Sequence, residues 1–92
     1  MPKKQSYDIT EVTEIFSIRE TLILQCIEHK WIEPVDPKAK KLDQEDISRL
    51  NFIQDLQEGM GVNDEAVPII LHLVDQIHYL RLKIEEEETK QD

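Results

Sequence analysis

The stretch GVNDEAVPIILHLVDQIHYLRLKIEEEE, residues 61–88, decides the fold of this 92-residue chain. Its apolar residues recur at steps of three, four, three and four, which is the spacing of a helix that pairs with another helix. These residues are Ile70, Leu73, Ile77, Leu80 and Ile84. Val67, Leu71 and Val74 make the apolar face wider than a two-helix seam requires, so part of it is expected to face the chain's own core. The pattern predicts a helix over residues 63–84 that closes a small domain and pairs with another copy of the chain or with another protein.

The two ends of this helix are less regular than its middle. Asn63 is predicted to open it, but Pro68 then falls where its ring meets a preceding carbonyl. Either the first turn is kinked, or the regular helix begins nearer Val67. The tail EEEETKQD, residues 85–92, is rich in like charges that repel one another, so it is predicted to fray.

Two short helices are predicted before this segment. Thr10 is the predicted N-cap of a first helix that ends at Phe16. Ser17 and Glu20 have the spacing of a capping box, so a second helix is expected to start there and to run to about His29. Because so few residues separate the two helices, the pair is predicted to form a tight helix-turn-helix.

A link and a third helix follow. The sequence WIEP, residues 31–34, is expected to be extended because a residue before proline leaves the helical region, and Trp31 is expected to anchor the core. Residues 35–42 form a short polar loop, interpreted as a reduced wing. Asp43 is the predicted N-cap of the third helix, which is expected to end near Glu58, with Gly59 or Gly61 as its left-handed cap. The predicted buried face of this helix consists of Ile47, Leu50, Ile53 and Leu56.

Composition limits the classes of function. The formal net charge is -9, and residues 41–92 hold thirteen acidic but five basic side chains. Such a surface repels the phosphate backbone of nucleic acids and favours encounter with a basic partner. A single cysteine, Cys26, excludes an internal disulfide and suits a reducing compartment. No apolar run reaches the length of a membrane span, so the chain is expected to be cytoplasmic.

No catalytic, cofactor or metal site is predicted. Nothing resembles a nucleophile elbow, a glycine-rich phosphate loop or a convergent acid/base pair. Cys26 with His29, and His72 with Asp75 and His78, have spacings that zinc ligands can adopt, but a structural zinc site needs four ligands brought together. Cys26 is better interpreted as a small core residue and the histidines as surface residues.

The order of the segments resembles the MerR-like helix-turn-helix architecture, and within it the CbpM family of chaperone modulators. The matching stretches are residues 9–11 (ITE), residues 31–34 (WIEP), GVN at 61–63 and LHLVDQIHYL at 71–80. The sequence departs from the family at Lys30, where the family commonly has glycine, and at Leu42, where it commonly has an aromatic residue. The implied organisation is all-α: a flexible N-terminus (1–8), a winged helix-turn-helix domain with a reduced wing (9–62), a dimerisation helix (63–84) and a frayed acidic tail (85–92).

The resemblance also implies a function. Members of that family bind and inhibit the J-domain of a DnaJ/CbpA-like co-chaperone, form homodimers through the last helix and have no catalytic residues. J-domains display a basic helical surface, so acidic residues on the second and third helices are the candidates for contact. These partner-binding candidates are Glu20, Glu28, Asp55 and Glu58.

A DNA-binding regulator is the alternative. A helix that enters the major groove needs outward-pointing basic or amide side chains, with phosphate contacts nearby. The candidates for this role are Arg19, Lys38, Lys40 and Lys41. The glutamates at positions 20 and 28, on the helix that would read the groove, weigh against it.

Overall fold

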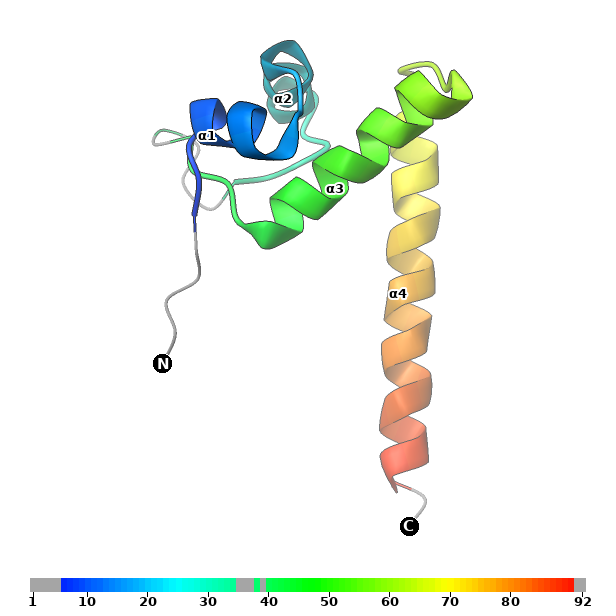
Figure 1. The fold of residues 1–92 in the computed structure, drawn as a ribbon. Helices are drawn as coiled ribbons and strands as arrows, with labels where there is room; N and C mark the ends of the chain where they lie inside the picture. Colours follow the sequence, from blue (N-terminus) through cyan, green and yellow to red (C-terminus); the bar gives the residue numbers. More distant parts are fainter. Residues whose placement is uncertain (1–5, 35–37, 39, 91–92) are drawn as a thin grey trace. The chain divides into compact units, whose positions relative to one another are not determined.

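The computed structural model describes residues 6–34, 38 and 40–90, and its regular elements over these ranges are all helical. The helices are α1 (Ile9–Phe16), α2 (Glu20–Glu28), α3 (Gln44–Gln54), the π-helical segment η1 (Asp55–Gly59) and α4 (Val67–Lys90) (Figure 1). Within the described ranges no strand is present, and an isolated antiparallel bridge joins Tyr7 to Leu42. The all-α fold class is therefore confirmed. The chain divides into two compact units, Met1–Val62 and Asn63–Asp92.

The first unit is built by α1, α2 and α3, which enclose a small apolar core (Figure 1). The apolar residues of α2 and α3 recur at helical spacing, so each helix turns one face inward. The predicted face of α3 is buried along its whole length, as are Trp31 and Cys26. The most deeply buried side chains of this unit are Val12, Ile18, Leu22, Ile23, Cys26, Ile32, Leu42, Ile47, Leu50 and Ile53.

The start of α1 differs from the prediction. Asp8, not Thr10, is its N-cap: the Asp8 carboxylate accepts from the Glu11 N–H at 2.8 Å, and Glu11 Oε1 accepts from the Asp8 N–H at 3.1 Å. The residue three positions after each candidate cap decides between Asp8 and Thr10. A capping box needs an acidic or amide side chain at that position, and Asp8 has Glu11 there whereas Thr10 has Thr13.

The predicted capping box at Ser17 is also wrong. Ser17 has φ 57°, in the left-handed region, and it ends α1 instead of starting α2. An N-cap residue needs extended backbone, which Arg19 supplies without any side-chain cap bond. The reversal at Ser17 is followed by Ile18, which is fully buried. The helix-turn-helix is therefore set by a left-handed turn and a buried isoleucine.

The end of α2 is a Schellman motif. The Lys30 N–H donates to the Ile27 carbonyl at 3.2 Å, the Trp31 N–H donates to the Cys26 carbonyl at 2.9 Å, and Lys30 has φ 60°. The buried Trp31 stacks on the His29 ring with centroids 4.7 Å apart, and its carbonyl accepts from Arg49 Nε at 2.6 Å. The left-handed exit is thus kept although a lysine occupies a position that favours glycine.

Replacing Lys30 by glycine is expected to stabilise the protein. The left-handed conformation costs a non-glycine residue about 1–2 kcal/mol, and a glycine avoids this cost. Glycine also has more conformational freedom in the unfolded chain, which offsets about 0.5–1 kcal/mol of the gain. The net gain should be about 0.5–1 kcal/mol, seen as a higher midpoint of urea unfolding. Lys41→Gly is the control, because Lys41 has no positive φ and lies beside the Tyr7–Leu42 bridge. An equal gain from both variants would contradict the explanation.

The predicted N-cap of α3 is confirmed and is built from two aspartates. The Asp43 carboxylate accepts from the Asp46 N–H at 2.9 Å, and Asp46 Oδ2 accepts from the Asp43 N–H at 3.1 Å. Asp46 is largely buried, and this burial raises the pKa of its carboxyl, with the neighbouring Asp43 and Glu45 charges acting in the same direction. The α-helical part of α3 ends at Gln54, earlier than predicted, because η1 adds a wider turn. Gly61, with φ 70°, provides the left-handed residue beyond it.

The raised pKa gives a testable pH dependence. The folded protein holds a proton on Asp46 more tightly than the unfolded chain does. Protonated Asp46 therefore stabilises the fold below about pH 3.8, and this stabilisation is lost as the pH rises through the folded pKa of Asp46. Asp46→Asn keeps an acceptor for the Asp43 N–H and removes the titration. The stability of this variant relative to the parent should therefore increase from pH 3 to pH 7 in urea titrations. Exposed Glu33→Gln is the control, and a flat difference for Asp46→Asn would refute the effect.

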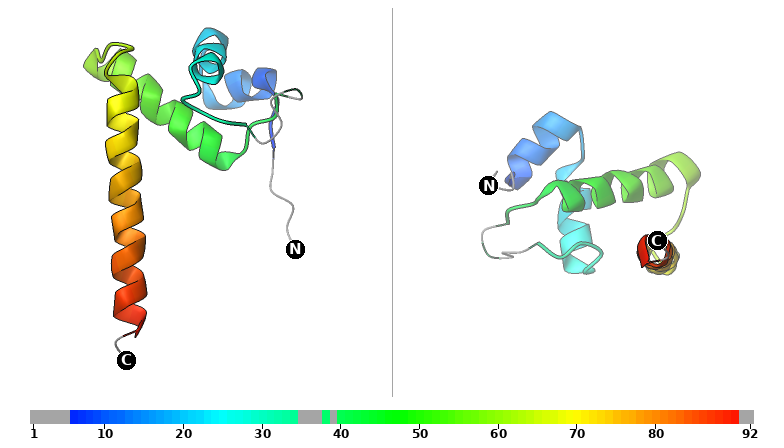
Figure 2. Two further views of the ribbon diagram at one scale, coloured as in Figure 1. Left: turned by 180° about the vertical axis from the view of Figure 1, so that it is seen from behind. Right: turned by 90° about the horizontal axis from the view of Figure 1, so that it is seen from below.

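The structure resolves the position of Pro68 in the second unit. The regular helix α4 begins at Val67, so Pro68 lies in its first turn, where backbone N–H groups have no partner within the helix. Before it, the Ala66 N–H donates to Asn63 Oδ1 at 3.0 Å, and the Ile70 N–H donates to the Ala66 carbonyl at 3.1 Å. Viewed along its axis, α4 is straight (Figure 2). Of the two alternatives, the later start is correct and no kink is needed.

Two further predictions concern segments at the limits of the described ranges. The helix α4 continues to Lys90, and the fraying predicted for residues 85–92 stays a prediction. Residues 35–37 and 39 of the predicted wing lie outside the described residues, as do residues 1–5 of the predicted flexible N-terminus and residues 91–92 of the predicted tail.

Candidate protein-binding surface

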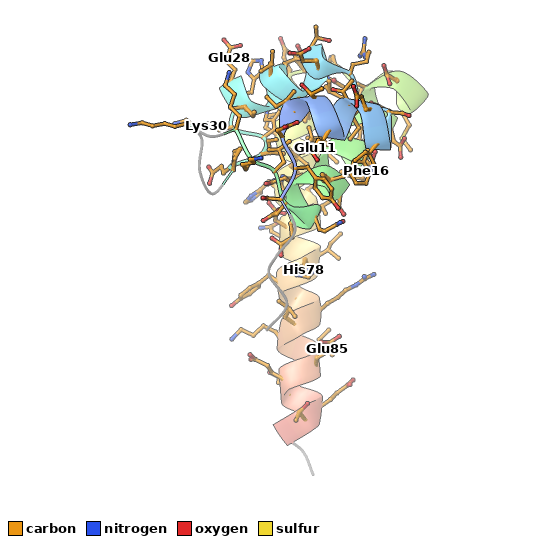
Figure 3. All side chains as sticks on the ribbon, turned by 60° about the vertical axis from the view of Figure 1, so that its left-hand side comes forward. Glu11, Phe16, Glu28, Lys30, His78 and Glu85 are labelled. Atoms are coloured by element: carbon orange, nitrogen blue, oxygen red, sulfur yellow. The ribbon has the colours of Figure 1, made fainter. Side chains whose placement is uncertain are left out.

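The outward face of α2 is acidic and partly apolar. Its exposed side chains are Glu20, Thr21, Leu24 and Glu28, and its buried ones are Leu22, Ile23 and Cys26. Because residues three or four apart lie on one side of a helix, the four exposed residues form a single strip, here called the α2 strip. Glu28 and, just beyond it, Lys30 point away from the body of the first unit (Figure 3). The α2 strip contains no lysine or arginine.

The four predicted partner-binding residues are all exposed, on α2 and η1. Glu58 Oε1 forms an ion pair with Arg19 Nη2 at 2.8 Å, which links the start of α2 to η1. Both side chains are well exposed, so the pair contributes little to stability. The ion pair does change the local charge. The negative charge of Glu58 is partly neutralised, and Arg19, a candidate phosphate contact, already has an anionic neighbour. Their assignment to partner binding stays a prediction.

Three of the four basic candidates lie beyond α2, whereas Arg19 is the N-cap of that helix. Lys38, Lys40 and Lys41 are exposed, and Lys40 has φ 52°. They occupy the segment before α3, whereas α2 is the helix that would enter a groove in a DNA-binding protein of this architecture. The structure thus places the lysines on the loop and leaves the α2 strip acidic.

Leu24 was missed by the sequence interpretation. It is 41% exposed, between Glu20 and Glu28 on the α2 strip. Leu22, Ile23 and Cys26 are buried on the inward face of α2, and Leu24 does not share that face. The sequence does contain a signal for this position. Leu24 is four residues from Glu20 and four from Glu28, so all three lie on one side of the helix.

The helix α4 carries a long apolar face. Val67 and Leu71 are buried, Ile70 is half-buried, and Val74 is 39% exposed. From Leu73 onward the predicted dimer-interface positions are open, with Leu73 and Ile77 52% exposed and Leu80 and Ile84 57% exposed. Eleven large apolar side chains are exposed in the described residues, and eight of them belong to α4. A face of this kind is typical of an interaction surface.

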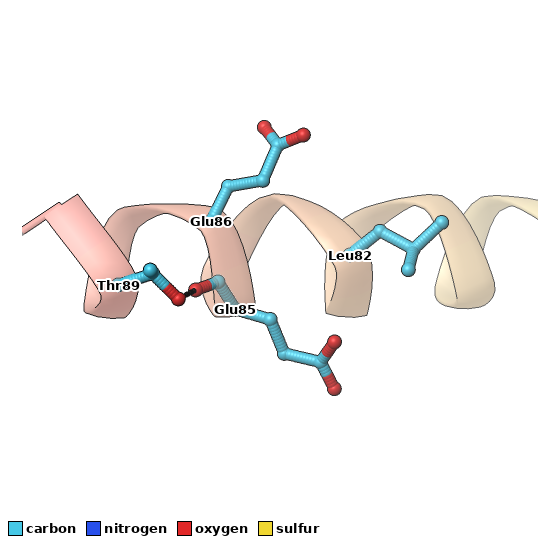
Figure 4. A pocket seen from close by; sticks show the side chains of 4 residues that line it. All are labelled: Leu82, Glu85, Glu86 and Thr89. Atoms are coloured by element: carbon cyan, nitrogen blue, oxygen red, sulfur yellow. Dashed lines mark hydrogen bonds between the residues drawn. The ribbon is translucent and has the colours of Figure 1, made fainter.

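A shallow hollow lies near the end of α4 (Figure 4). It is lined by Leu82, Glu85, Glu86 and Thr89, and the Thr89 hydroxyl donates to the Glu85 carbonyl at 2.9 Å. Tyr79 and Lys83 line a second hollow beside it, with Lys83 Nζ 5.7 Å from the centre of the Tyr79 ring. All these residues come from one helix, so the hollows are spaces between exposed side chains and enclose no ligand site.

The described residues offer neither a cluster of metal ligands nor a membrane-spanning helix. Over residues 6–34, 38 and 40–90, no group of three or more His, Cys, Asp or Glu side chains is arranged to hold a metal ion. The Cys26 thiol is buried in the first unit. None of the described helices is long and apolar enough to cross a membrane.

Two helices joined by a three-residue turn, an extended link, a third helix and a long final helix define a MerR-type helix-turn-helix protein. The sequence pattern of the MerR HTH family of regulatory proteins matches residues 7–88, and the chain belongs to this family. It is also similar to the chaperone modulatory protein CbpM of Coxiella burnetii strains Dugway 5J108-111 and RSA 331 / Henzerling II. Each is 26% identical to it over 78 residues, or 83% of this chain and 74% of the relative. The resemblance found in the sequence is confirmed.

Proposed function

We propose that this chain modulates a chaperone system by binding and inhibiting the J-domain of a DnaJ/CbpA-like co-chaperone, without catalysing a reaction. The similarity to proteins named chaperone modulatory protein CbpM supports the class of function. The proposed mode of action is supported by the acidic α2 strip. This strip lies on the helix that would enter a DNA groove in a DNA-binding protein of this architecture. A basic helical surface, such as that of a J-domain, complements it in charge.

The proposal includes a homodimer formed through α4. The exposed apolar positions of that helix support it, because a single chain leaves them in water. In the dimer, two copies of the acidic α2 strip are available to partners.

The direct test is a binding experiment with purified proteins. Immobilised full-length protein should capture an isolated J-domain, and in solution it should reduce J-domain-stimulated ATP hydrolysis by the Hsp70 partner. Capture should weaken as salt is raised, because charge pairs at an exposed rim are screened. Failure to capture J-domains from several DnaJ/CbpA-like proteins would overturn the proposal.

DNA binding is the second candidate, favoured by membership of the MerR family and by the exposed lysines at 38, 40 and 41. A gel shift on random duplex, run beside the J-domain capture, separates the two functions. Salt-sensitive duplex binding that is lost on replacing the three lysines by glutamine, together with no J-domain capture, would establish this alternative.

A further inference from the structure

The position of Glu28 has no explanation within the first unit. It is the last residue of α2, where the helix dipole disfavours a negative charge, and the last turn contains no basic residue. Glu28 is exposed and has no ion pair with any residue in the described ranges. A charge placed against a local rule, with no ion pair to offset it, marks a candidate functional position.

Leu24 lies one helical turn before Glu28 and one turn after Glu20. Its side chain is 41% exposed, and the half-buried Ile27, three residues on, lies beside it on the helix surface. The backbone positions of Glu20 and Glu28 are about 12 Å apart along the α2 axis, from eight residues at 1.5 Å each. An acidic group, an apolar group and a second acidic group therefore follow one another at intervals of one turn.

We propose that Leu24 is the apolar anchor of the J-domain contact and that Glu20 and Glu28 hold a basic helix across it. This inference rests on the proposed function and adds the chemistry of the helix that binds the α2 strip. The matching helix carries Lys or Arg two turns apart, at positions i and i+7 or i+8, with an apolar residue at i+4. Lysine and arginine stems cover apolar surface while their charged ends stay at its edge, so they satisfy both kinds of group at once.

Leucine truncation gives the first test. Leu24→Ala keeps the helix, since alanine is the strongest helix former, and should weaken J-domain binding by tenfold or more, mainly through faster dissociation. Ile15→Ala is the matched control: Ile15 is an apolar residue 59% exposed on α1, outside the α2 strip, and its removal should change affinity less than twofold. Circular dichroism and urea unfolding of each variant verify the fold.

Glutamate removal gives a second, independent readout. Glu28→Gln should raise the midpoint of urea unfolding, because it relieves the unfavourable charge at the end of α2, and should weaken binding several-fold. A purely structural role would not move stability and affinity in opposite directions. Glu33→Gln, an exposed acidic residue outside α2, should change neither.

The outcomes distinguish this inference from the proposed function. If the parent protein captures the J-domain and Leu24→Ala binds within twofold of it, the anchor assignment is wrong and the proposed function stands. If Glu28→Gln lowers stability and leaves affinity unchanged, the charge assignment at this position is wrong. If the parent protein does not capture any J-domain, both the proposed function and this inference fall.

Discussion

Replacing Ile53 by alanine is expected to lower the free energy of unfolding by about 2–5 kcal/mol. Ile53 lies on α3 and is fully buried, with 0% of its surface exposed. The loss combines the transfer of the removed methyl and methylene groups with the cavity that the surrounding side chains fail to fill. Since small domains are stable by about 5–15 kcal/mol, this one substitution removes a large share of the total.

The measurement is urea unfolding followed by circular dichroism at 25 °C. Ile15→Ala is the matched control, because it removes the same atoms from a side chain that is 59% exposed and should change stability by less than about 0.5 kcal/mol. A loss below 1 kcal/mol for Ile53→Ala, or equal losses for the two variants, would show that the core is not centred on α3.

The core of the first unit was predictable because burial follows helical spacing. Ile47, Leu50, Ile53 and Leu56 repeat every three residues, and all four are buried. The cap at Asp43 was predictable for a similar reason, since an acidic residue three positions later confirms it. Periodicity and capping are local in sequence and need no knowledge of the rest of the fold.

The first two helix starts were predicted less well because two valid signals competed at each. Asp8 and Thr10 are both good caps, and Glu11 decides between them. Ser17 has the right partner for a cap, but the chain needs a left-handed residue there to reverse direction before the buried Ile18. A tertiary requirement therefore overrode a local motif.

The candidate site was predicted in part. The acidic residues followed from charge and from the family resemblance, but Leu24 required knowledge of which face of α2 is exposed. An apolar residue among other apolar residues gives no signal by itself. Only the buried positions of Leu22, Ile23 and Cys26 show that Leu24 is on the other side.

The second large effect is expected on self-association. Ile77→Glu should convert the proposed dimer to a monomer at micromolar concentration, so that the sedimentation mass falls from twice 10.9 kDa to 10.9 kDa. Ile77 is the central position of the heptad stripe and is 52% exposed on a single chain. Because glutamate is a good helix former and the position is open, the single chain should keep its fold.

The size of this effect follows from the number of side chains that change. Burying one isoleucine is worth about 1.5–3 kcal/mol, and a symmetric seam contains the residue twice, so the association constant should fall by at least about a hundredfold. His72→Glu is the matched control, since His72 is exposed and lies about 140° around the helix from Ile77, at 100° per residue. It should stay dimeric. A glutamate at the centre of the α4 seam would leave an unpaired charge buried in an apolar contact. An Ile77→Glu variant that remains dimeric would therefore refute this seam, as would a parent protein that sediments as a single chain.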